Sequence, residues 1–226
     1  MKRKKSFFLW LFLLIVLTTY NFDSRENLFS SFFKIKKIEI EGIQNSDRKE
    51  IEEKFNLFKE KNIIFTNQKQ FRKLIDNLEL VKEIKVKKIY PDKIKITIKE
   101  FKIIGIFVDE KNQKEYILTD HGKIINNYNK KQFNDLPLVF GENADKIFFT
   151  FYPSLEAVGF EIELIKYFNY FDIKRWDIIL KDGKLIKLPS TNYEKSLKKF
   201  LSIYETENFK KFRVFDFRVN GQLIIK

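Results

Sequence analysis

This chain of 226 residues contains no cysteine and a single histidine, and this excludes several kinds of site. Without cysteine, the chain has no disulfide framework, thiolate zinc site, iron–sulfur cluster or cysteine nucleophile. The single histidine, His121, excludes a multi-histidine metal site and leaves a Ser-His-Asp triad with one candidate base. His121 stands in Asp-His-Gly between two predicted strands, so we interpret it as a turn residue and predict no metal and no cofactor.

Glycines and clustered acid–base residues are scarce as well. The seven glycines are scattered at predicted turns, so the sequence has no phosphate-binding loop. Glutamates that lie close together have lysine neighbours and the spacing of exposed faces, which is typical of solvated surface. These glutamates are Glu39, Glu41, Glu50, Glu52 and Glu53. The sequence therefore predicts a protein that is not an enzyme and has no small-molecule substrate.

Basic residues are in clear excess, with 44 Lys and Arg against 31 Asp and Glu and a formal net charge of +13. Such an excess is compatible with nucleic-acid binding. However, lysine supplies 37 of the basic residues and alanine occurs only twice, a usage that AT-rich codons produce. The phenylalanines alternate inward on predicted strands and do not interleave with exposed basic residues, so nucleic-acid binding is the weaker alternative.

The N-terminal segment has the features of a membrane anchor. Four basic residues at 2–5 precede seventeen uncharged residues at 6–22, of which 7–17 are all apolar. Basic residues before an apolar run favour a cytoplasmic N-terminus and export of the following chain. A cleavable signal peptide begins in the same way but needs small residues at its cleavage site, and no such triplet follows this run. We therefore expect a cytoplasmic tail at 1–5, a transmembrane helix at 6–22 and a linker at 23–33.

Residues 34–101 show the order strand, helix, helix, strand, strand. Isoleucines alternate with glutamates at 38–41, which indicates the first strand. Two segments with one apolar helical face follow, and Asn67 is a candidate cap for the second. After a turn at 90–92, isoleucines at 94, 96 and 98 alternate with polar residues in a last strand. Because the two helices can cover the one apolar face of the sheet, we predict a compact α+β domain.

The following residues, 102–226, are predicted to form a mostly antiparallel, β-rich domain with flanking helices. Short apolar strands alternate with turns in this part of the sequence. An apolar stretch at 144–158 indicates a helix broken by Pro153, and an apolar face at 197–204 indicates another helix. Trp176 lies opposite its two charged neighbours on an alternating strand, so we predict that it is part of the core.

Several short motifs occur in a fixed order along the chain. The first is the hairpin with its turn Tyr90-Pro91-Asp92, which resembles the final hairpin of a POTRA domain, a small module of extracytoplasmic protein contacts. The later motifs are Asp120-x-Gly122, Leu136-Pro137 before Gly141, Arg175-Trp176-Asp177, Asp182-Gly183, Leu188-Pro189 and Phe215-Asp216-Phe217-Arg218. With the anchor, these motifs resemble the FtsQ/DivIB family of bacterial cell-division proteins over nearly the whole chain. The Arg-Trp-Asp form looks most like the alphaproteobacterial branch of that family.

This resemblance implies a scaffold of the divisome, the machinery of bacterial cell division. It implies a single-pass protein of the cell inner membrane, with a cytoplasmic N-terminus and the bulk of the chain in the periplasm at the division septum. In this family the extracytoplasmic region binds FtsB and FtsL and links early and late division proteins, and the POTRA domain offers a surface to other divisome members. The alternatives are another POTRA-bearing scaffold for envelope assembly or transport, and a basic nucleic-acid-binding protein.

The predicted partner site lies on the strand at 214–219. In an alternating strand Phe215, Phe217 and Val219 share one face, which we expect to pack inward, and Arg218 then lies exposed on the other face. We expect this strand at an open sheet edge, where a partner can add a strand.

The resemblance implies that FtsB is held along this strand with help from arginines, which match Arg218 and Arg175. Each arginine would grip a partner carboxylate with its planar fork. The alternative interpretation is that the two arginines pair within the chain, with Asp216 and Asp177. The predicted partner-binding residues are Arg175, Val214, Asp216, Arg218, Val219 and Asn220.

Overall fold

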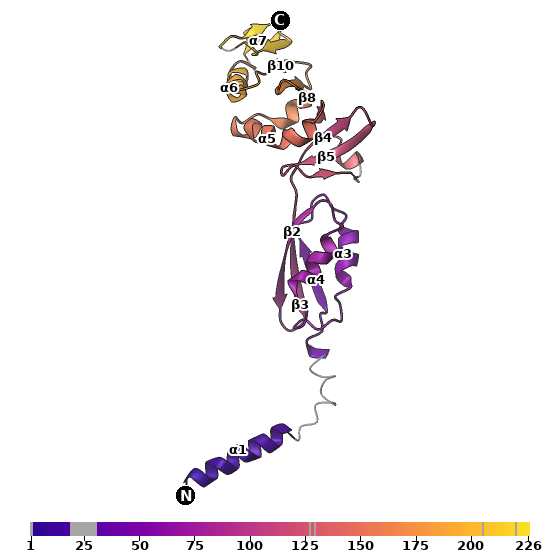
Figure 1. Cartoon of the computed structure of the whole chain (residues 1–226), viewed down its shortest axis with the longest axis vertical. Helices are drawn as coiled ribbons and strands as arrows, with labels where there is room; N and C mark the ends of the chain where they lie inside the picture. The colour runs from indigo at the N-terminus through magenta and orange to yellow at the C-terminus, as the bar shows by residue number, and fades with distance from the viewer. Residues whose placement is uncertain (1, 19–30, 127, 129, 205, 220) are drawn as a thin grey trace. The chain divides into compact units, whose positions relative to one another are not determined.

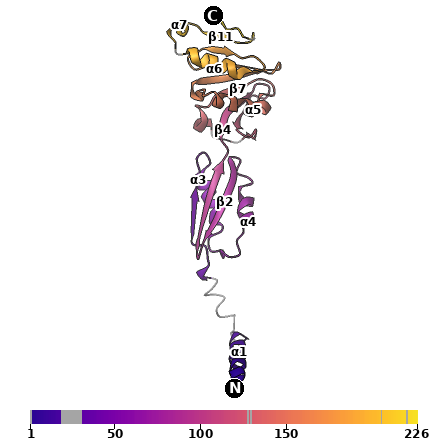
Figure 2. The same ribbon diagram turned by 90° about the vertical axis from the view of Figure 1, so that its left-hand side faces the viewer.

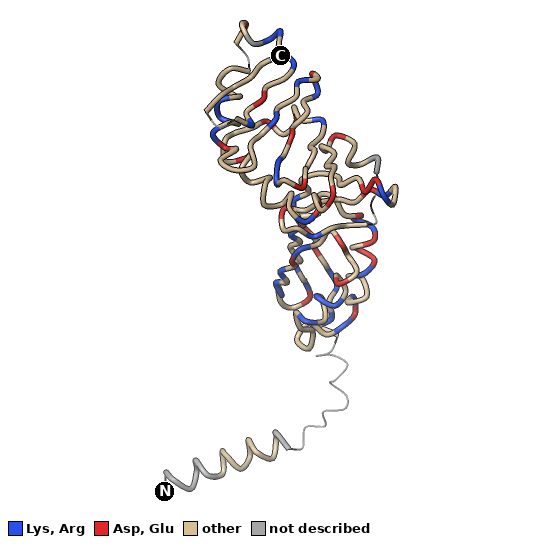
Figure 3. Tube along the Cα trace, turned by 45° about the horizontal axis from the view of Figure 1, so that its top comes forward, with Lys and Arg blue, Asp and Glu red and all other residues tan. Residues whose placement is uncertain are grey.

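The computed structural model describes the chain except for residues 1, 19–30, 127, 129, 205 and 220 (Figure 1). It divides into two compact units, Met1–Glu100 and Phe101–Lys226, and a separate hydrophobic core lies in each. From residue 31 onward, basic and acidic residues are interspersed along both units, so the positive charge of this part of the chain is not gathered in one segment (Figure 3).

The N-terminal segment forms helix α1, Lys2–Thr18. Its described side chains, at 8–16, are all apolar and exposed. Among the described residues, no helix combines the length and the apolar character that crossing a membrane requires. Residues 19–22 of the expected transmembrane segment lie outside the described residues, as does most of the expected linker.

The rest of the first unit has the predicted order of elements. These elements are β1 (Lys37–Glu41), α3 (Arg48–Asn56), α4 (Gln68–Ile75), β2 (Val81–Ile89) and β3 (Lys93–Glu100). The strands form a sheet in the order β1-β3-β2, in which β1 is parallel and β2 antiparallel to β3. Both helices lie on one face of this sheet (Figure 1, Figure 2). The predicted β-α-α-β-β order is therefore confirmed.

Alternation in β3 decides which face of this sheet is buried. Ile94, Ile96 and Ile98 are almost completely buried in the core under the helices, as predicted. Helix α4 begins at the predicted cap, because the Asn67 side chain accepts a hydrogen bond from the Gln70 backbone N–H at 3.1 Å. The Gln70 side chain accepts one in return from the Asn67 backbone N–H at 2.9 Å, which completes a capping box.

The second unit is built on one sheet, in the order β12-β11-β10-β9-β8-β7-β4-β5-β6. The strands are β4 (Ile103–Asp109), β5 (Lys114–Thr119), β6 (Ile124–Ile125), β7 (Leu138–Phe140), β8 (Ile165–Phe171), β9 (Arg175–Leu180), β10 (Leu185–Lys187), β11 (Val214–Asp216) and β12 (Ile224–Ile225). A short 3₁₀ helix, η2 (Lys130–Phe133), precedes β7, and another, η3 (Ile162–Leu164), precedes β8.

This sheet is mixed, so the prediction of mostly antiparallel pairing is wrong. Strand β7 is parallel to both β4 and β8, and β10 is parallel to β11. Parallel neighbours require a crossover connection. Helix α5 (Ala144–Ala157) connects β7 to β8, while α6 (Tyr193–Tyr204) and α7 (Glu207–Lys210) connect β10 to β11. The local turn signals identify hairpins but not these crossovers.

Helices α5 and α6 pack on one face of the sheet over a core that is rich in aromatic rings. Trp176 of β9 is buried, as predicted, and stacks on Phe151 of α5 with ring centroids 4.9 Å apart. The edges of neighbouring rings meet this pair, with Phe148 at 5.6 Å and Phe168 at 6.4 Å from Trp176. Ile178 and Leu180 of β9 share this core with Trp176. Arg175 and Asp177 alternate with Trp176 and therefore lie on the opposite face of the sheet.

Helix α5 continues through Pro153, where we expected it to break. Proline removes one backbone hydrogen bond and costs about 3 kcal/mol or more in a helix interior. On the other side, α5 buries Phe148, Phe151 and Leu155 completely or nearly so. Burying each such side chain contributes about 1.5–3 kcal/mol, so the packing of this helix on the sheet outweighs the proline.

Candidate partner-binding site

Strands β9, β10 and β11 bring charged side chains together on the sheet face opposite α5 and α6. In the β9–β10 pairing Asp177 lies across from Lys187, and in the β10–β11 pairing Lys187 lies across from Asp216. Cross-strand neighbours of opposite charge attract each other. The strand register alone therefore places a lysine between two carboxylates.

The two arginines predicted to bind a partner lie beside these carboxylates. Arg175 Nε is 3.2 Å from Asp177 Oδ1. Arg218 Nε donates to both Asp216 oxygens, at 2.8 and 3.0 Å, and its Nη2 donates to Oδ2 at 2.5 Å. We call these five residues, Arg175, Asp177, Lys187, Asp216 and Arg218, the charged row. The interpretation in which each arginine pairs with the aspartate two residues away is confirmed for the unbound chain.

The two carboxylates of the charged row have different electrostatic environments. Burial raises the pKa of Asp177 above its usual value, although the positive charges of Arg175, Lys187 and Arg218 oppose that rise. The hydrogen bonds from Arg218 lower the pKa of Asp216. The Arg218 side chain is itself 44% exposed, so a carboxylate arriving from solvent can reach it. Arg175 is much less accessible, since its side chain is 15% exposed.

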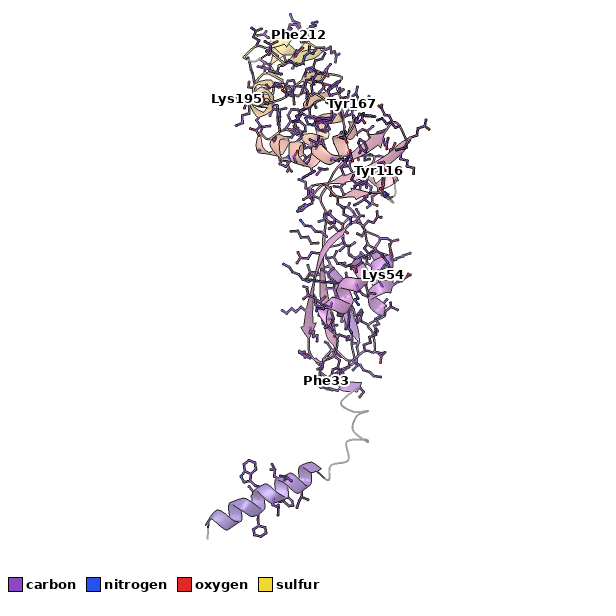
Figure 4. All side chains as sticks on the ribbon, in the orientation of Figure 1. Phe33, Lys54, Tyr116, Tyr167, Lys195 and Phe212 are labelled. Carbon is purple, nitrogen blue, oxygen red and sulfur yellow. The ribbon has the colours of Figure 1, made fainter. Side chains whose placement is uncertain are left out.

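A groove of about 380 Å³ adjoins Arg218, between α6 and the segment that follows β11. Lys195 and Lys199 lie one helical turn apart on α6 and line this groove with Arg218 and Phe217. Figure 4 labels Lys195 on α6. Among the described residues of the lining, three are basic and none is acidic. The groove therefore suits an acidic polypeptide segment.

The other predicted residues of this segment follow the expected alternation only as far as Phe217. Phe215 and Phe217 are buried and Arg218 is exposed, as predicted. Val219 was expected to pack inward but is 48% exposed. The strand ends at Asp216 and the chain turns, with the Gln222 backbone N–H donating to the Val219 carbonyl at 3.1 Å. Val214 is half-buried, and Asn220 lies outside the described residues.

The expectation that this strand forms the sheet edge is wrong. Strand β12 pairs antiparallel with β11 and covers its outer side, with Phe215 across from Ile225 and Asp216 across from Ile224. In the described part of the chain, β12 is the last strand on that side of the sheet. A partner strand would therefore add to β12, one strand farther out than predicted.

Three residues of the site were not anticipated from the sequence. Lys187 joins the charged row only through the sheet register, which no local pattern reveals. Lys195 and Lys199 have a visible signal, because they lie four residues apart on the polar side of an amphipathic helix. That spacing predicts a common face but not what the face adjoins.

His121 lies in the turn after β5, as predicted, with Nδ1 2.8 Å from Asp120 Oδ1. Within the described ranges, no group of three or more histidine, aspartate and glutamate side chains could hold a metal ion. The candidate site described above combines charge pairs, a basic groove and a strand edge.

Comparison with known proteins gives two matches to family models. Residues 33–101 match the POTRA domain of FtsQ type, and residues 107–218 match the C-terminal domain of cell division protein FtsQ/DivIB.

Individual relatives carry the name cell division protein FtsQ. One from Caulobacter vibrioides is 25% identical over 76% of this chain and 57% of its own length. Another from Rhizobium meliloti is 23% identical over 77% of this chain and 56% of its own length. A third from Rickettsia bellii is 30% identical over 74% of this chain and 61% of its own length. The chain thus spans less than two thirds of the length of these relatives.

Proposed function

Since the chain belongs to the FtsQ/DivIB family of cell-division proteins, we propose that it is a scaffold of the bacterial divisome. As a scaffold it binds other division proteins at the septum and catalyses no reaction. The observation that supports this role best is the charged row beside the basic groove, because it forms a surface suited to a protein segment.

In this proposal the protein is anchored in the cell inner membrane, with its N-terminus in the cytoplasm and residues 34–226 in the periplasm. The support is the basic cluster at 2–5 followed by the uncharged segment at 6–22. Residues 34–101 would act as the POTRA domain and residues 102–226 as the partner-binding domain.

The proposed partners are FtsB and FtsL, bound at the second unit through an acidic segment of FtsB. Arg218 would exchange part of its pairing with Asp216 for a partner carboxylate, and Lys195 and Lys199 would attract further acidic groups into the groove. Strand β12 would accept the partner backbone by strand addition. Arg175 would support the site from within the charged row.

Arg218→Glu tests this proposal. The full chain, purified in detergent, is titrated with the FtsB–FtsL complex of the same organism. We expect binding to weaken at least tenfold, because an attraction to a carboxylate becomes a repulsion. Arg48→Glu is the matched control, since Arg48 is also an exposed arginine with a side-chain partner, Glu52, but lies in the first unit.

Circular dichroism verifies that both variants fold. Unchanged binding by folded Arg218→Glu would contradict the site and move it elsewhere. The groove is tested in the same way by Lys195→Glu with Lys199→Glu. Lys198→Glu serves as its control, because Lys198 is exposed on the same helix but does not line the groove.

A further inference from the structure

Five large apolar side chains of the first unit are exposed outside α1, and four of them, Phe32, Ile64, Phe65 and Tyr90, gather at one end of it. Among the described residues from 31 to 100, the large hydrophobic side chains that are exposed are Phe32, Leu57, Ile64, Phe65 and Tyr90. The most exposed is Phe65, at 79%. A folded domain gains nothing from exposing such a group to water, and clustered exposed apolar residues mark interaction surfaces.

Backbone and ring contacts place Phe32, Ile64 and Tyr90 around Phe33, and Phe65 directly follows Ile64; we call these five residues the apolar end. The Ile63 backbone N–H donates to the Phe33 carbonyl at 2.8 Å, which places Ile64 beside Phe33. The Phe33 ring meets the edges of Phe32 and Tyr90, with centroids 5.3 and 6.5 Å away. Figure 4 labels Phe33 at this end of the unit.

The core does not require these side chains. Phe58 stacks on Phe71 with centroids 3.9 Å apart, and Ile63 is completely buried. The loop between α3 and α4 thus contributes Phe58 and Ile63 to the core while it turns Ile64 and Phe65 outward. A polar residue at position 65 would leave the core packing unchanged.

Lysines surround the apolar end. The segments 32–36, 57–66 and 88–92 contain five lysines and two acidic residues. The two acidic residues pair with Lys34 and Lys36, at 3.4 Å for Glu60 and 3.7 Å for Asp92. Lys59 and Lys61 are exposed and add positive charge beside Ile64 and Phe65. Aromatic rings flanked by lysines are the combination that settles at the boundary between lipid tails and anionic headgroups.

Chain length puts a membrane within reach of this end. Twelve residues, 19–30, separate the last described residue of α1 from residue 31. Twelve residues span at most about 40 Å when extended, at 3.3–3.6 Å each. If α1 is held in the membrane, the apolar end is therefore tethered close to the membrane surface.

We propose that the apolar end of the first unit binds an anionic lipid surface, with Phe65 and Ile64 inserted among the headgroups and Lys59 and Lys61 paired with lipid charge. This inference rests on the proposed membrane anchor. It assigns this end of the unit to lipid and leaves its other surfaces to protein partners.

A single fluorescent label tests the proposal, because the chain has no cysteine. Full-length Phe65→Cys is labelled with an environment-sensitive dye and reconstituted into vesicles of phosphatidylcholine with or without one quarter phosphatidylglycerol. The control label is at Lys99→Cys, an exposed position at the other end of β3. We expect a blue shift and quenching by a lipid-soluble quencher at position 65 in the anionic vesicles and an aqueous spectrum at position 99.

A second variant separates lipid charge from simple proximity. Lys59→Glu with Lys61→Glu should lower the bound fraction of the position-65 label, because each lysine near an anionic surface changes binding about fivefold. An aqueous spectrum at position 65 in anionic vesicles would overturn the proposal and indicate a protein partner for this end.

Flotation of the same samples after an alkaline wash tests whether α1 anchors the chain in the vesicles, separately from lipid binding by the apolar end. A chain that floats with an aqueous label at 65 refutes the lipid-binding end and retains the anchor. A chain that is stripped from the vesicles by the wash, while the label shifts before the wash, retains the lipid-binding end and refutes the anchor.

Discussion

At the scale of single residues, the pKa values of Asp177 and Asp216 shift in opposite directions within the charged row. The two carboxylates lie on either side of Lys187, yet burial raises the pKa of Asp177 and hydrogen bonds from Arg218 lower the pKa of Asp216. Folding therefore favours the protonated form of Asp177 and the ionised form of Asp216.

This difference predicts opposite pH dependences for two matched variants. Asp216 contributes stability above its unfolded pKa of about 3.9, and that contribution is lost as the pH falls through its lower folded value. Asp216→Asn should therefore be destabilised relative to wild type at pH 7 and converge with it in acid. The stability of Asp177→Asn relative to wild type should increase as the pH rises, because the wild type must then ionise a buried carboxyl group. Urea unfolding of both variants at pH 3 and pH 7 measures these differences. If the two variants change in stability with pH in the same direction, the opposite pKa shifts of Asp177 and Asp216 are contradicted.

A second prediction at this scale concerns the backbone at Gly141, directly after β7. Its φ is +112°, and an added Cβ would lie 2.3 Å from the carbonyl oxygen of Tyr170 in β8. Gly159 also has a positive φ, +74°, but a Cβ there meets no atom within 4 Å. Gly159→Ala should cost about 1–2 kcal/mol for its left-handed backbone. Gly141→Ala should cost about 1–3 kcal/mol more, because the neighbouring strand must also move. Equal unfolding midpoints would show that β7 and β8 are farther apart.

At the scale of elements, we can test which side chains of β3 point into the core. Ile96 is completely buried, whereas Lys95 on the other face pairs with Glu41 of β1 at 2.7 Å. Ile96→Lys places an unpaired charge in the core and should destabilise the first unit by about 4 kcal/mol or more. Lys95→Ser, one residue away, should unfold close to the wild-type midpoint. Similar thermal shifts for the two variants would mean that the strand has the opposite phase.

Elements that depend on local pattern were predictable, and elements that depend on distant pairing were not. The alternation around Ile96 and the cap at Asn67 involve neighbours in sequence, so the first unit followed directly. The parallel pairs of β7 and β10 arise from crossovers through α5 and α6, and no local turn residue records them. The predicted break at Pro153 is wrong for a related reason. The helix is maintained by burial against the sheet, which the local sequence does not record.

The candidate site likewise has features that local pattern predicts and features that depend on distant strand pairing. The exposure of Arg218 agrees with the predicted alternation, although the strand itself ends at Asp216. The pairing of Arg218 with Asp216 is one of the two interpretations that the sequence allows. The position of Lys187 between two aspartates needed the register of three strands. The edge was misplaced by one strand, because the pair Ile224–Ile225 is too short to be recognised as a strand by its pattern.

At the scale of the whole molecule, attachment to the membrane is the main prediction. We expect the protein to remain with the inner membrane after an alkaline wash and to retain its N-terminal basic residues. Leu13→Arg should release a measurable fraction, because an arginine in the centre of a membrane helix costs about 2.5–3.5 kcal/mol on insertion scales. Leu13→Ile is the matched control and should stay bound. A mature protein that begins near residues 21–26 would show instead that the segment is a cleaved signal peptide.

Strand β12 also has a consequence for how readily this part of the molecule fluctuates. It is two residues long, and directly after it Lys226 exchanges backbone hydrogen bonds with Arg213 and Val214 at 2.8–3.1 Å. Short exposed pairings of this kind open at free energies far below that of global unfolding. A partner that binds against β12 must first immobilise it, and the entropy of that ordering subtracts from the affinity. In exchange, we expect the bound partner to suppress local opening of this short pairing.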